Sequence, residues 1–214
     1  MEQILGNSEI SDWIGSKNTS CGIVDIVTAE LINSTIGKKP NEDFKNGDPL
    51  PPLWHWFAFP SATHLSQLGD DGHPKHVGYT PPKDLTRRMW ASGSLTFHSN
   101  LRVGEEITKD TTVSDIKEKE SQSGKMVFIT YEHKLRNSGN IAITETQNIV
   151  YLQASDTFNP PKKRDVPQPD YPKAKIVISN PLLFRFSALT YNAHRIHYDL
   201  KYAQEVEKYP HLIV

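Results

Sequence analysis

The sequence predicts an α+β fold in which an antiparallel sheet curls around one helix near the N-terminus. Apolar residues recur at helical spacing over residues 27–36, and Gly37 follows them as a stop. Residues 107–116, 125–135 and 141–152 are each long enough for a strand, and polar turns separate them. One helix followed by a run of long, meandering strands is typical of a sheet that covers a helix.

The most aromatic stretch of the chain is residues 53–59, which read Leu-Trp-His-Trp-Phe-Ala-Phe. Aromatic side chains at this density pack in a core or an oligomer interface, and they also line ligand pockets. Both interpretations stay open, and Trp54 and Trp56 are therefore candidate substrate-binding residues.

The chain divides at a proline-rich segment. Residues 158–174 hold five prolines and several charges, a composition typical of a linker. We therefore expect an N-terminal unit over residues 1–157 and the start of a second unit over residues 175–214. The second unit should begin with a short strand at 175–179, followed by a helix that Asn180 caps.

Composition and charge exclude several classes of function. The 214 residues are 36% hydrophobic and 23% charged, and the formal net charge of -1 argues against nucleic acid or an anionic membrane as a partner. The single cysteine, Cys21, leaves no intrachain disulfide and no cysteine-based zinc cage. The N-terminus lacks the pattern of a secretory or mitochondrial signal, and no apolar run reaches the roughly 20 residues of a membrane span. We expect a soluble, cytoplasmic protein from a bacterium.

Residues 190–199 carry the densest group of chemically reactive side chains. The run Thr-Tyr-Asn-Ala-His-Arg-Ile-His-Tyr-Asp places His194 and His197 on a loop ahead of a helix that Asp199 caps. These three residues have some metal-ligand character, but two histidines three apart suit zinc less well than two histidines four apart on a helix. No second ligand cluster is apparent, so we predict no metal site. Ser187 lacks the flanking glycines of a nucleophile elbow.

This loop resembles the hydratase motif of the MaoC-like hot-dog family. That motif reads Ser-Gly-Asp-x-Asn-Pro-aliphatic-His-x-Asp and precedes a Tyr-Ala pair, which Tyr202 and Ala203 match here. Residues 47–56 and 87–93 are similar to the N-terminal half of one branch of the family. The branch holds mesaconyl-C4-CoA hydratase, itaconyl-CoA hydratase and the 3-hydroxyacyl-thioester dehydratase of type 2. The resemblance implies a double hot-dog, in which the unit of sheet and helix is repeated.

The resemblance places the family's catalytic histidine on His197 and the position of its usual aspartate on Asn192. Because an asparagine cannot take up a proton, Asn192 is expected only to orient water, and His197 to carry the acid–base chemistry. His194 and Arg195 replace the family's Asn-Pro, and with Tyr191 they are candidate substrate-binding residues. The planar guanidinium of Arg195 suits a substrate carboxylate or a CoA phosphate, and a structural salt bridge is the alternative.

The activity that the resemblance implies is reversible addition of water to an enoyl thioester, with a short dicarboxylic substrate such as mesaconyl- or itaconyl-CoA. The partner is then an acyl-CoA or an acyl-carrier-protein thioester, no cofactor apart from the CoA of the substrate is expected, and the protein is expected to be a homodimer. The alternatives are a 3-hydroxyacyl-thioester dehydratase of fatty-acid synthesis and a non-catalytic protein that binds acyl thioesters. In relatives a helix whose first amides hold the thioester oxygen follows the motif, and it would begin after Val214. We therefore expect the second hot-dog to be truncated.

Overall fold

The computed structural model describes residues 10–37, 43–75, 85–121, 124–153, 157, 165 and 176–214. The strands are Lys17–Ile23 (β1), Arg87–Phe97 (β2), Glu106–Ser121 (β3), Gly124–Asn137 (β4) and Asn140–Leu152 (β5). The α-helices are Ile26–Ile36 (α1), Asn180–Leu189 (α2) and Leu200–Glu205 (α3). The short 3-10 helices are Ile10–Trp13 (η1), Trp54–Ala58 (η2), Leu65–Gln67 (η3) and Arg195–His197 (η4).

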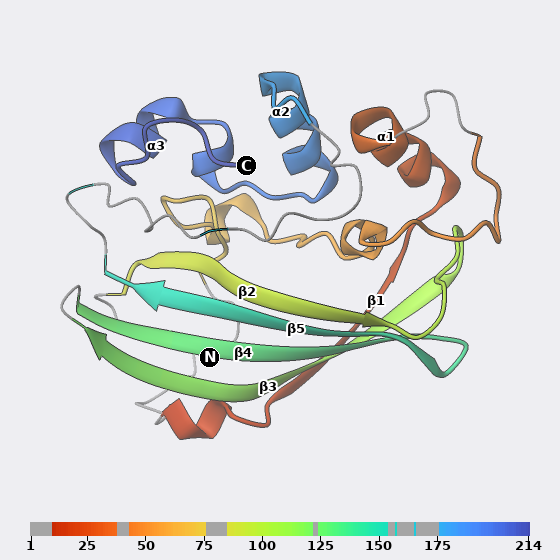
Figure 1. Ribbon diagram of the computed structural model, residues 1–214, viewed down its shortest axis with the longest axis horizontal. Helices are drawn as coiled ribbons and strands as arrows, with labels where there is room; N and C mark the ends of the chain where they lie inside the picture. Colours follow the sequence, from red (N-terminus) through yellow and green to blue (C-terminus); the bar gives the residue numbers. More distant parts are fainter. Residues whose placement is uncertain are drawn as a thin grey trace.

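The five strands form one antiparallel sheet, hydrogen-bonded in the order β1-β3-β4-β5-β2. Figure 1 shows α1, α2 and α3 together on one side of this sheet, with η1 on the other side. The predicted α+β architecture and the three predicted long strands are confirmed, because those strands lie within β3, β4 and β5. The turn between β4 and β5 has positive φ at Ser138 (46°) and Gly139 (85°), as a type I′ hairpin turn requires.

Helix α1 forms where the hydrophobic spacing predicts it and packs against the sheet. Of the expected apolar face of Leu31, Ile32 and Ile36, however, Leu31 and Ile36 are exposed. Asp25 caps it by accepting a hydrogen bond from the Thr28 backbone N–H at 2.7 Å. Ala29 and Ile32 are fully buried, and they join a core with Trp54, Phe57 and apolar residues of β3, β4 and β5. Burial of this face, more than the helix propensity of an 11-residue segment, stabilises α1.

Two local predictions in the C-terminal part are wrong. The predicted strand at 175–179 is not seen in its described residues, because 176–179 have no regular structure. The cap of α2 is Ser179 rather than Asn180: the Ser179 hydroxyl accepts a hydrogen bond from Leu182 N–H at 3.4 Å, and Asn180 is the first helical residue. The Asp199 cap of α3 is confirmed by a 3.0 Å hydrogen bond from Tyr202 N–H.

The sheet and α1 occupy the predicted N-terminal unit, residues 1–157. The predicted linker at 158–174 lies outside the described residues, apart from residue 165. The described residues 176–214 contain helices and no strand, so the second repeat and its truncation remain predictions.

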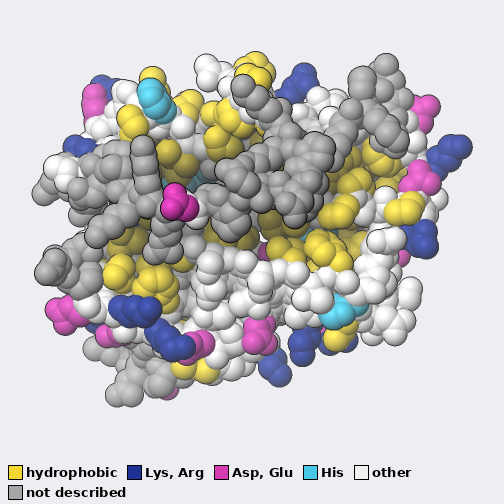
Figure 2. Space-filling view, in the orientation of Figure 1, with side chains coloured by type: hydrophobic (Ala, Val, Ile, Leu, Met, Phe, Trp, Pro, Cys, Tyr) yellow, Lys and Arg dark blue, Asp and Glu magenta, His cyan; other side chains and the backbone are white. Residues whose placement is uncertain are grey.

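Charges of both signs are interspersed on the surface over the sheet, along the lower edge of Figure 2, as expected for a chain of nearly zero net charge. Among the described ranges, no helix has the length and apolar character needed to cross a membrane.

Candidate active site

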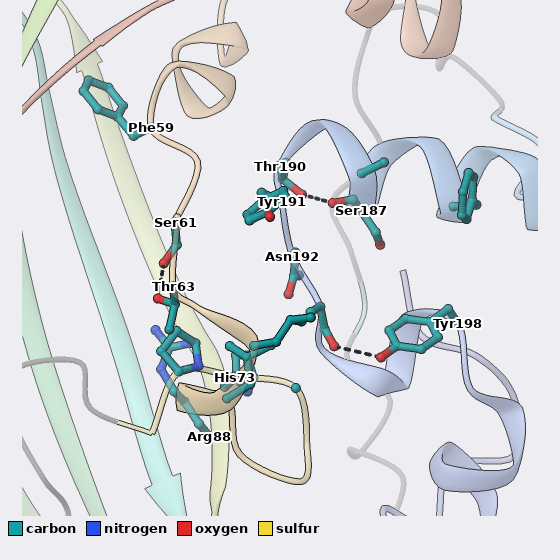
Figure 3. A pocket seen from close by; sticks show the side chains of 17 residues that line it. Phe59, Ser61, Thr63, His73, Arg88, Ser187, Thr190, Tyr191, Asn192 and Tyr198 are labelled. Atoms are coloured by element: carbon teal, nitrogen blue, oxygen red, sulfur yellow. Dashed lines mark hydrogen bonds between the residues drawn. The ribbon is translucent and has the colours of Figure 1, made fainter.

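A cavity of about 660 Å³ lies between the segment that precedes β2 and the predicted motif loop. Figure 3 shows Phe59, Ser61 and Thr63 on one side of it, and Thr190 and Asn192 on the other. A cavity of this size, with mainly apolar walls and a few polar groups, is typical of a small-molecule site.

The motif loop begins where α2 ends, and local hydrogen bonds fix its course. The Thr190 hydroxyl donates to the Phe186 carbonyl at 2.9 Å, and the Asn192 backbone N–H donates to Ser187 O at 2.8 Å. Tyr191 adopts positive φ (53°), an uncommon conformation for a bulky residue. The Asn192 side-chain oxygen then accepts a hydrogen bond from His194 N–H at 3.0 Å. Asn192 therefore holds a fixed position at the cavity wall.

A second loop, residues 69–74, docks on the motif loop. The Arg195 backbone N–H donates to Asp71 O at 2.9 Å, and Arg195 Nη1 donates to Asp70 O at 3.0 Å. Gly72 has positive φ (90°), and a Cβ built on it would lie 1.9 Å from the Ala193 carbonyl oxygen. The two loops, far apart in the sequence, thus form a single rigid wall.

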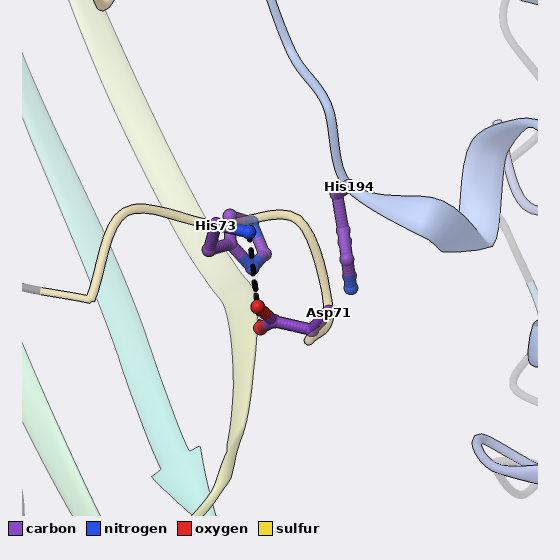
Figure 4. A group of neighbouring side chains, drawn as sticks. All are labelled: Asp71, His73 and His194. Carbon is purple, nitrogen blue, oxygen red and sulfur yellow. Dashed lines mark hydrogen bonds and ion pairs between the residues drawn. The ribbon is translucent and has the colours of Figure 1, made fainter. Parts of the chain in front are cut away.

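Three polar residues meet where these loops touch. His73 Nδ1 lies 3.0 Å from Asp71 Oδ2, and the His73 and His194 rings face each other at 4.0 Å between centroids (Figure 4). Burial of Asp71 alone would raise its pKa, but hydrogen bonds from His73 hold that pKa below its usual value. Burial, reinforced by the charge of His73, lowers the pKa of His194 to about 3. His194 is therefore neutral at physiological pH.

The same three residues form a group that could hold a metal ion, which the sequence did not reveal. Asp71, His73 and His194 each offer one ligand atom, and these atoms lie within 4.8 Å of one another. Two histidines and a carboxylate form a ligand set known for divalent metals. The Asp71 carboxylate, however, already accepts two hydrogen bonds from His73, through the ring and the backbone N–H.

The predicted acid–base residue, His197, lies behind the cavity wall. Its Nδ1 is 2.8 Å from the Ile213 carbonyl oxygen, and its ring meets that of His194 edge-on at 5.6 Å. His197 is not among the residues that line the cavity, whereas Asn192 and Tyr191 are. The structure thus brings His194, His197 and Asn192 together, but His197 lies behind the residues that line the cavity.

Arg195 is predicted from the sequence to bind a substrate anion, with a structural salt bridge as the alternative. The structure shows the salt bridge. Arg195 Nε and Nη2 donate to Asp199 Oδ2 at 3.1 and 2.8 Å, and the guanidinium lies over the Tyr202 ring at 4.2 Å. The residue that does bring a guanidinium to the cavity is Arg88 of β2. Its Nε is buried, and its guanidinium hydrogen-bonds the Tyr151 hydroxyl.

The two predicted tryptophans lie away from this cavity. Trp54 is buried in the core, with its ring 5.5 Å from that of Phe44. Trp56 donates through Nε1 to Glu145 Oε1 at 3.1 Å. Neither lines the cavity.

Sequence reasoning did not single out three residues of this site: Asp71, His73 and Arg88. The available signal for the first two was the run Gly-Asp-Asp-Gly-His-Pro at residues 69–74, which places a carboxylate and a histidine in a glycine-containing turn. For Arg88 the only signal was its place in the segment similar to one branch of the family.

Comparison with known proteins gives consistent results. The family described as hydroxyacyl-thioester dehydratase type 2 matches residues 53–214. The chain is 39% identical to mesaconyl-C(4)-CoA hydratase of Chloroflexus aurantiacus, covering 98% of this chain and 75% of that protein. It is 28% identical to the mitochondrial hydroxyacyl-thioester dehydratase type 2 of Schizosaccharomyces pombe, covering 77% of this chain and 62% of that protein.

Among solved structures, HtdX of Mycobacterium tuberculosis superposes with a TM-score of 0.61 at 15% identity, covering 93% of this chain and 70% of that one. At this identity the likeness shows a shared fold.

Proposed function

We propose that the protein is a lyase that adds water reversibly to an enoyl thioester, because the chain belongs to the hydroxyacyl-thioester dehydratase type 2 family. Its substrate is a short dicarboxylic enoyl-CoA of the mesaconyl- or itaconyl-CoA kind. The relative at 39% identity, a mesaconyl-C(4)-CoA hydratase, supports this substrate class.

The observation that carries the substrate class is the position of Arg88. A dicarboxylic acyl group has a free carboxylate in addition to its thioester, and that carboxylate needs a cationic partner once it leaves water. Arg88 brings a guanidinium to a cavity whose other walls include Phe59, Leu68 and Phe184. Arg195 is paired with Asp199 and does not line the cavity. Arg88 lines it and has only the neutral Tyr151 hydroxyl as a known partner in the described part of the chain.

The motif supplies the residues for the reaction. His197 is the acid–base group that the family motif assigns, and its Nδ1 contact with the Ile213 carbonyl leaves Nε2 as the nitrogen for proton transfer. Asn192, at the cavity wall, orients the water through its amide. Tyr191 lines the pocket beside it, and His194 packs against His73 behind the wall. No step in this scheme draws on a cofactor.

A dehydratase of fatty-acid synthesis is the second candidate, and the relative from Schizosaccharomyces pombe favours it. The two candidates differ in the acyl group. A fatty-acid dehydratase acts on longer monocarboxylic chains, which have no second carboxylate for the Arg88 guanidinium to bind.

The test is hydration of mesaconyl-C4-CoA, crotonyl-CoA and a long-chain enoyl-CoA by the wild-type protein and by His197→Ala. We expect the dicarboxylic thioester to be hydrated best, and His197→Ala to lower kcat by roughly 10²- to 10⁴-fold. Equal activity of the two proteins would exclude the role of His197. Preference for the long chain would favour the dehydratase, and tight binding without turnover would indicate a non-catalytic thioester-binding protein.

Location and assembly are further parts of the proposal. A cytoplasmic location is supported by the single cysteine and by the bacterial relative. A homodimer is supported by exposed apolar side chains next to α2, including Ile176 (71% exposed) and Val177 (78%). Light scattering on the purified protein tests the assembly.

A further inference from the structure

We propose that Asp71 and His73 form a carboxylate–histidine dyad that supplies the site with a second acid–base group, in place of the aspartate that Asn192 replaces. This inference rests on the proposed hydratase function and names a further catalytic residue, His73, with Asp71 as its positioning residue.

The geometry of the pair fixes the orientation of the imidazole. One oxygen of Asp71 accepts a hydrogen bond from the His73 backbone N–H at 2.9 Å, and the other lies 3.0 Å from His73 Nδ1. An ionised carboxylate can only accept hydrogen bonds, so Nδ1 carries the hydrogen and Nε2 presents its lone pair. A carboxylate that holds a histidine in this tautomer is the arrangement that prepares an imidazole to act as a base.

Hydrogen bonds and a close backbone contact hold the dyad in a fixed position against the motif loop. Two hydrogen bonds from Arg195, one from its backbone and one from its guanidinium, end on the carbonyls of Asp71 and Asp70. Gly72, between the two dyad residues, lies against the Ala193 carbonyl too closely to leave room for a Cβ. Because the loops are joined so tightly, His73 keeps a fixed position relative to Asn192.

His73 is the histidine that lines the cavity. It lies there with Asn192 and Tyr198, whereas His194 and His197 are not among the lining residues. Figure 3 shows His73 and Asn192 at the same end of the cavity. His194, buried and neutral, packs on the inner face of the His73 ring and does not compete with it for protons.

The proposed step balances without any further reactant. His73 Nε2 removes a proton from water while the water oxygen bonds to the β-carbon and the C=C π electrons move toward the thioester oxygen as an enolate. As the enolate collapses, the α-carbon takes a proton from the motif's acid–base group, protonated His197, relayed by a water because His197 lies behind the cavity wall. Exchange with bulk water resets both imidazoles, so the net change is addition of one H and one OH.

A bound divalent cation is the competing interpretation of the same residues. Two observations favour the dyad. Both carboxylate oxygens of Asp71 are engaged by His73, and the cationic Arg88 is close enough to act on His194 electrostatically. A positive charge at that distance opposes a cation site.

The experiment compares wild type, His73→Gln and Asp71→Asn, with His98→Gln as the matched control. His98 is exposed, its Nε2 lies 2.9 Å from the Thr144 hydroxyl on β5, and it does not line the cavity. We expect His73→Gln to lower kcat for mesaconyl-C4-CoA by roughly 10²- to 10⁴-fold with KM little changed, and His98→Gln to match wild type. Asp71→Asn should lower kcat and change the pH profile of kcat/KM, because the amide can impose the other tautomer.

A second measurement does not depend on turnover. Nitrogen NMR of the His73 ring reports its tautomer, and we expect the Nδ1–H form in wild type and its loss in Asp71→Asn, with circular dichroism showing that the variant is folded. The His73→Gln variant keeping wild-type kcat, or a wild-type His73 in the Nε2–H form, would overturn the dyad and leave the hydratase function standing. A wild-type protein inactive on every thioester would overturn the function and the dyad together. Loss of wild-type activity in EDTA, with recovery in Zn²⁺ or Mn²⁺, would overturn the dyad in favour of a cation site.

Discussion

Gly72 and Ala193 touch through their backbones, and this contact joins the N-terminal half of the protein to the motif loop. The space beside Gly72 is too small for any side chain, since a Cβ would lie 1.9 Å from the Ala193 carbonyl oxygen. The φ of +90° at Gly72 also disfavours every residue except glycine. Two independent physical reasons therefore require glycine at the point where the loops meet.

We expect Gly72→Ala to lower the free energy of unfolding by about 3 kcal/mol, from a left-handed backbone and from a steric clash. Urea denaturation measures this change. Gly47→Ala is the matched control, because Gly47 has the same φ of +90° and a Cβ at that position would have nothing within 4 Å of it. Its cost should be only the backbone part, about 1–2 kcal/mol. Equal costs for the two variants would show that the Gly72 loop does not dock against Ala193.

Stability should depend on pH through His194. Its folded-state pKa of about 3 lies below the ordinary value, so between these two values the unfolded chain binds the extra proton. Stability is therefore fully present above about pH 6.5 and is lost as the pH falls toward 3. From pH 7 to pH 5 the loss attributable to His194 is about 2 kcal/mol.

The His194→Asn variant tests this pH dependence. The quantity to compare is the change in the free energy of unfolding between pH 7 and pH 5, and not the free energy at one pH. We expect the drop between pH 7 and pH 5 to shrink by about 2 kcal/mol. Burial also lowers the pKa of His133, but that residue contributes equally to both proteins. His64→Gln, a change at an exposed histidine, should leave the drop as in wild type. An unchanged drop in His194→Asn would contradict the buried, neutral state of His194.

A buried carboxylate under η2 should be a major determinant of stability. Glu145 is 2% exposed, accepts hydrogen bonds from Trp56 Nε1 and Gln147 Nε2, and lies 3.5 Å from His55. Replacing it with leucine leaves these donors without an acceptor, so Glu145→Leu should cost about 3–5 kcal/mol by urea denaturation. Glu132→Leu, at an exposed position on the neighbouring strand β4, should change stability by about 0.5 kcal/mol or less. Similar costs for both would contradict a stabilising role of the buried network.

Much of the fold was predictable because its long strands alternate and its helices carry recognisable caps. Strand β1 was not, since Lys17–Ile23 has little apolar character and owes its place to pairing with β3. The ends of α1 and the Asp199 cap followed from local hydrogen bonding, which sequence spacing reflects.

The site was predictable only where it is local in sequence. Residues 190–199 form one continuous motif, whereas Asp71 and His73 join it through a tertiary contact that no spacing encodes. The role of Arg195 shows the same limit. Its bond to Asp199, four residues on, was foreseeable as an alternative, but the bond to Asp70 was not.

Arg88 should determine which thioesters the protein prefers. A charge-assisted hydrogen bond to a desolvated carboxylate contributes about 1.5–3 kcal/mol. Arg88→Met should therefore lower kcat/KM for mesaconyl-C4-CoA by roughly 10- to 10²-fold. Crotonyl-CoA has no second carboxylate, so its kcat/KM should change by less than about threefold.

Steady-state kinetics of both substrates with Arg88→Met and Arg102→Met measure this difference. Arg102 is exposed and bonds the Gly47 carbonyl away from the cavity, so its variant should keep the wild-type ratio of the two kcat/KM values. A loss confined to the dicarboxylic substrate assigns the carboxylate to Arg88, because a general distortion of β2 would slow both substrates alike. Equal losses on the two thioesters would instead make Arg88 a structural residue and remove the main support for a dicarboxylic substrate.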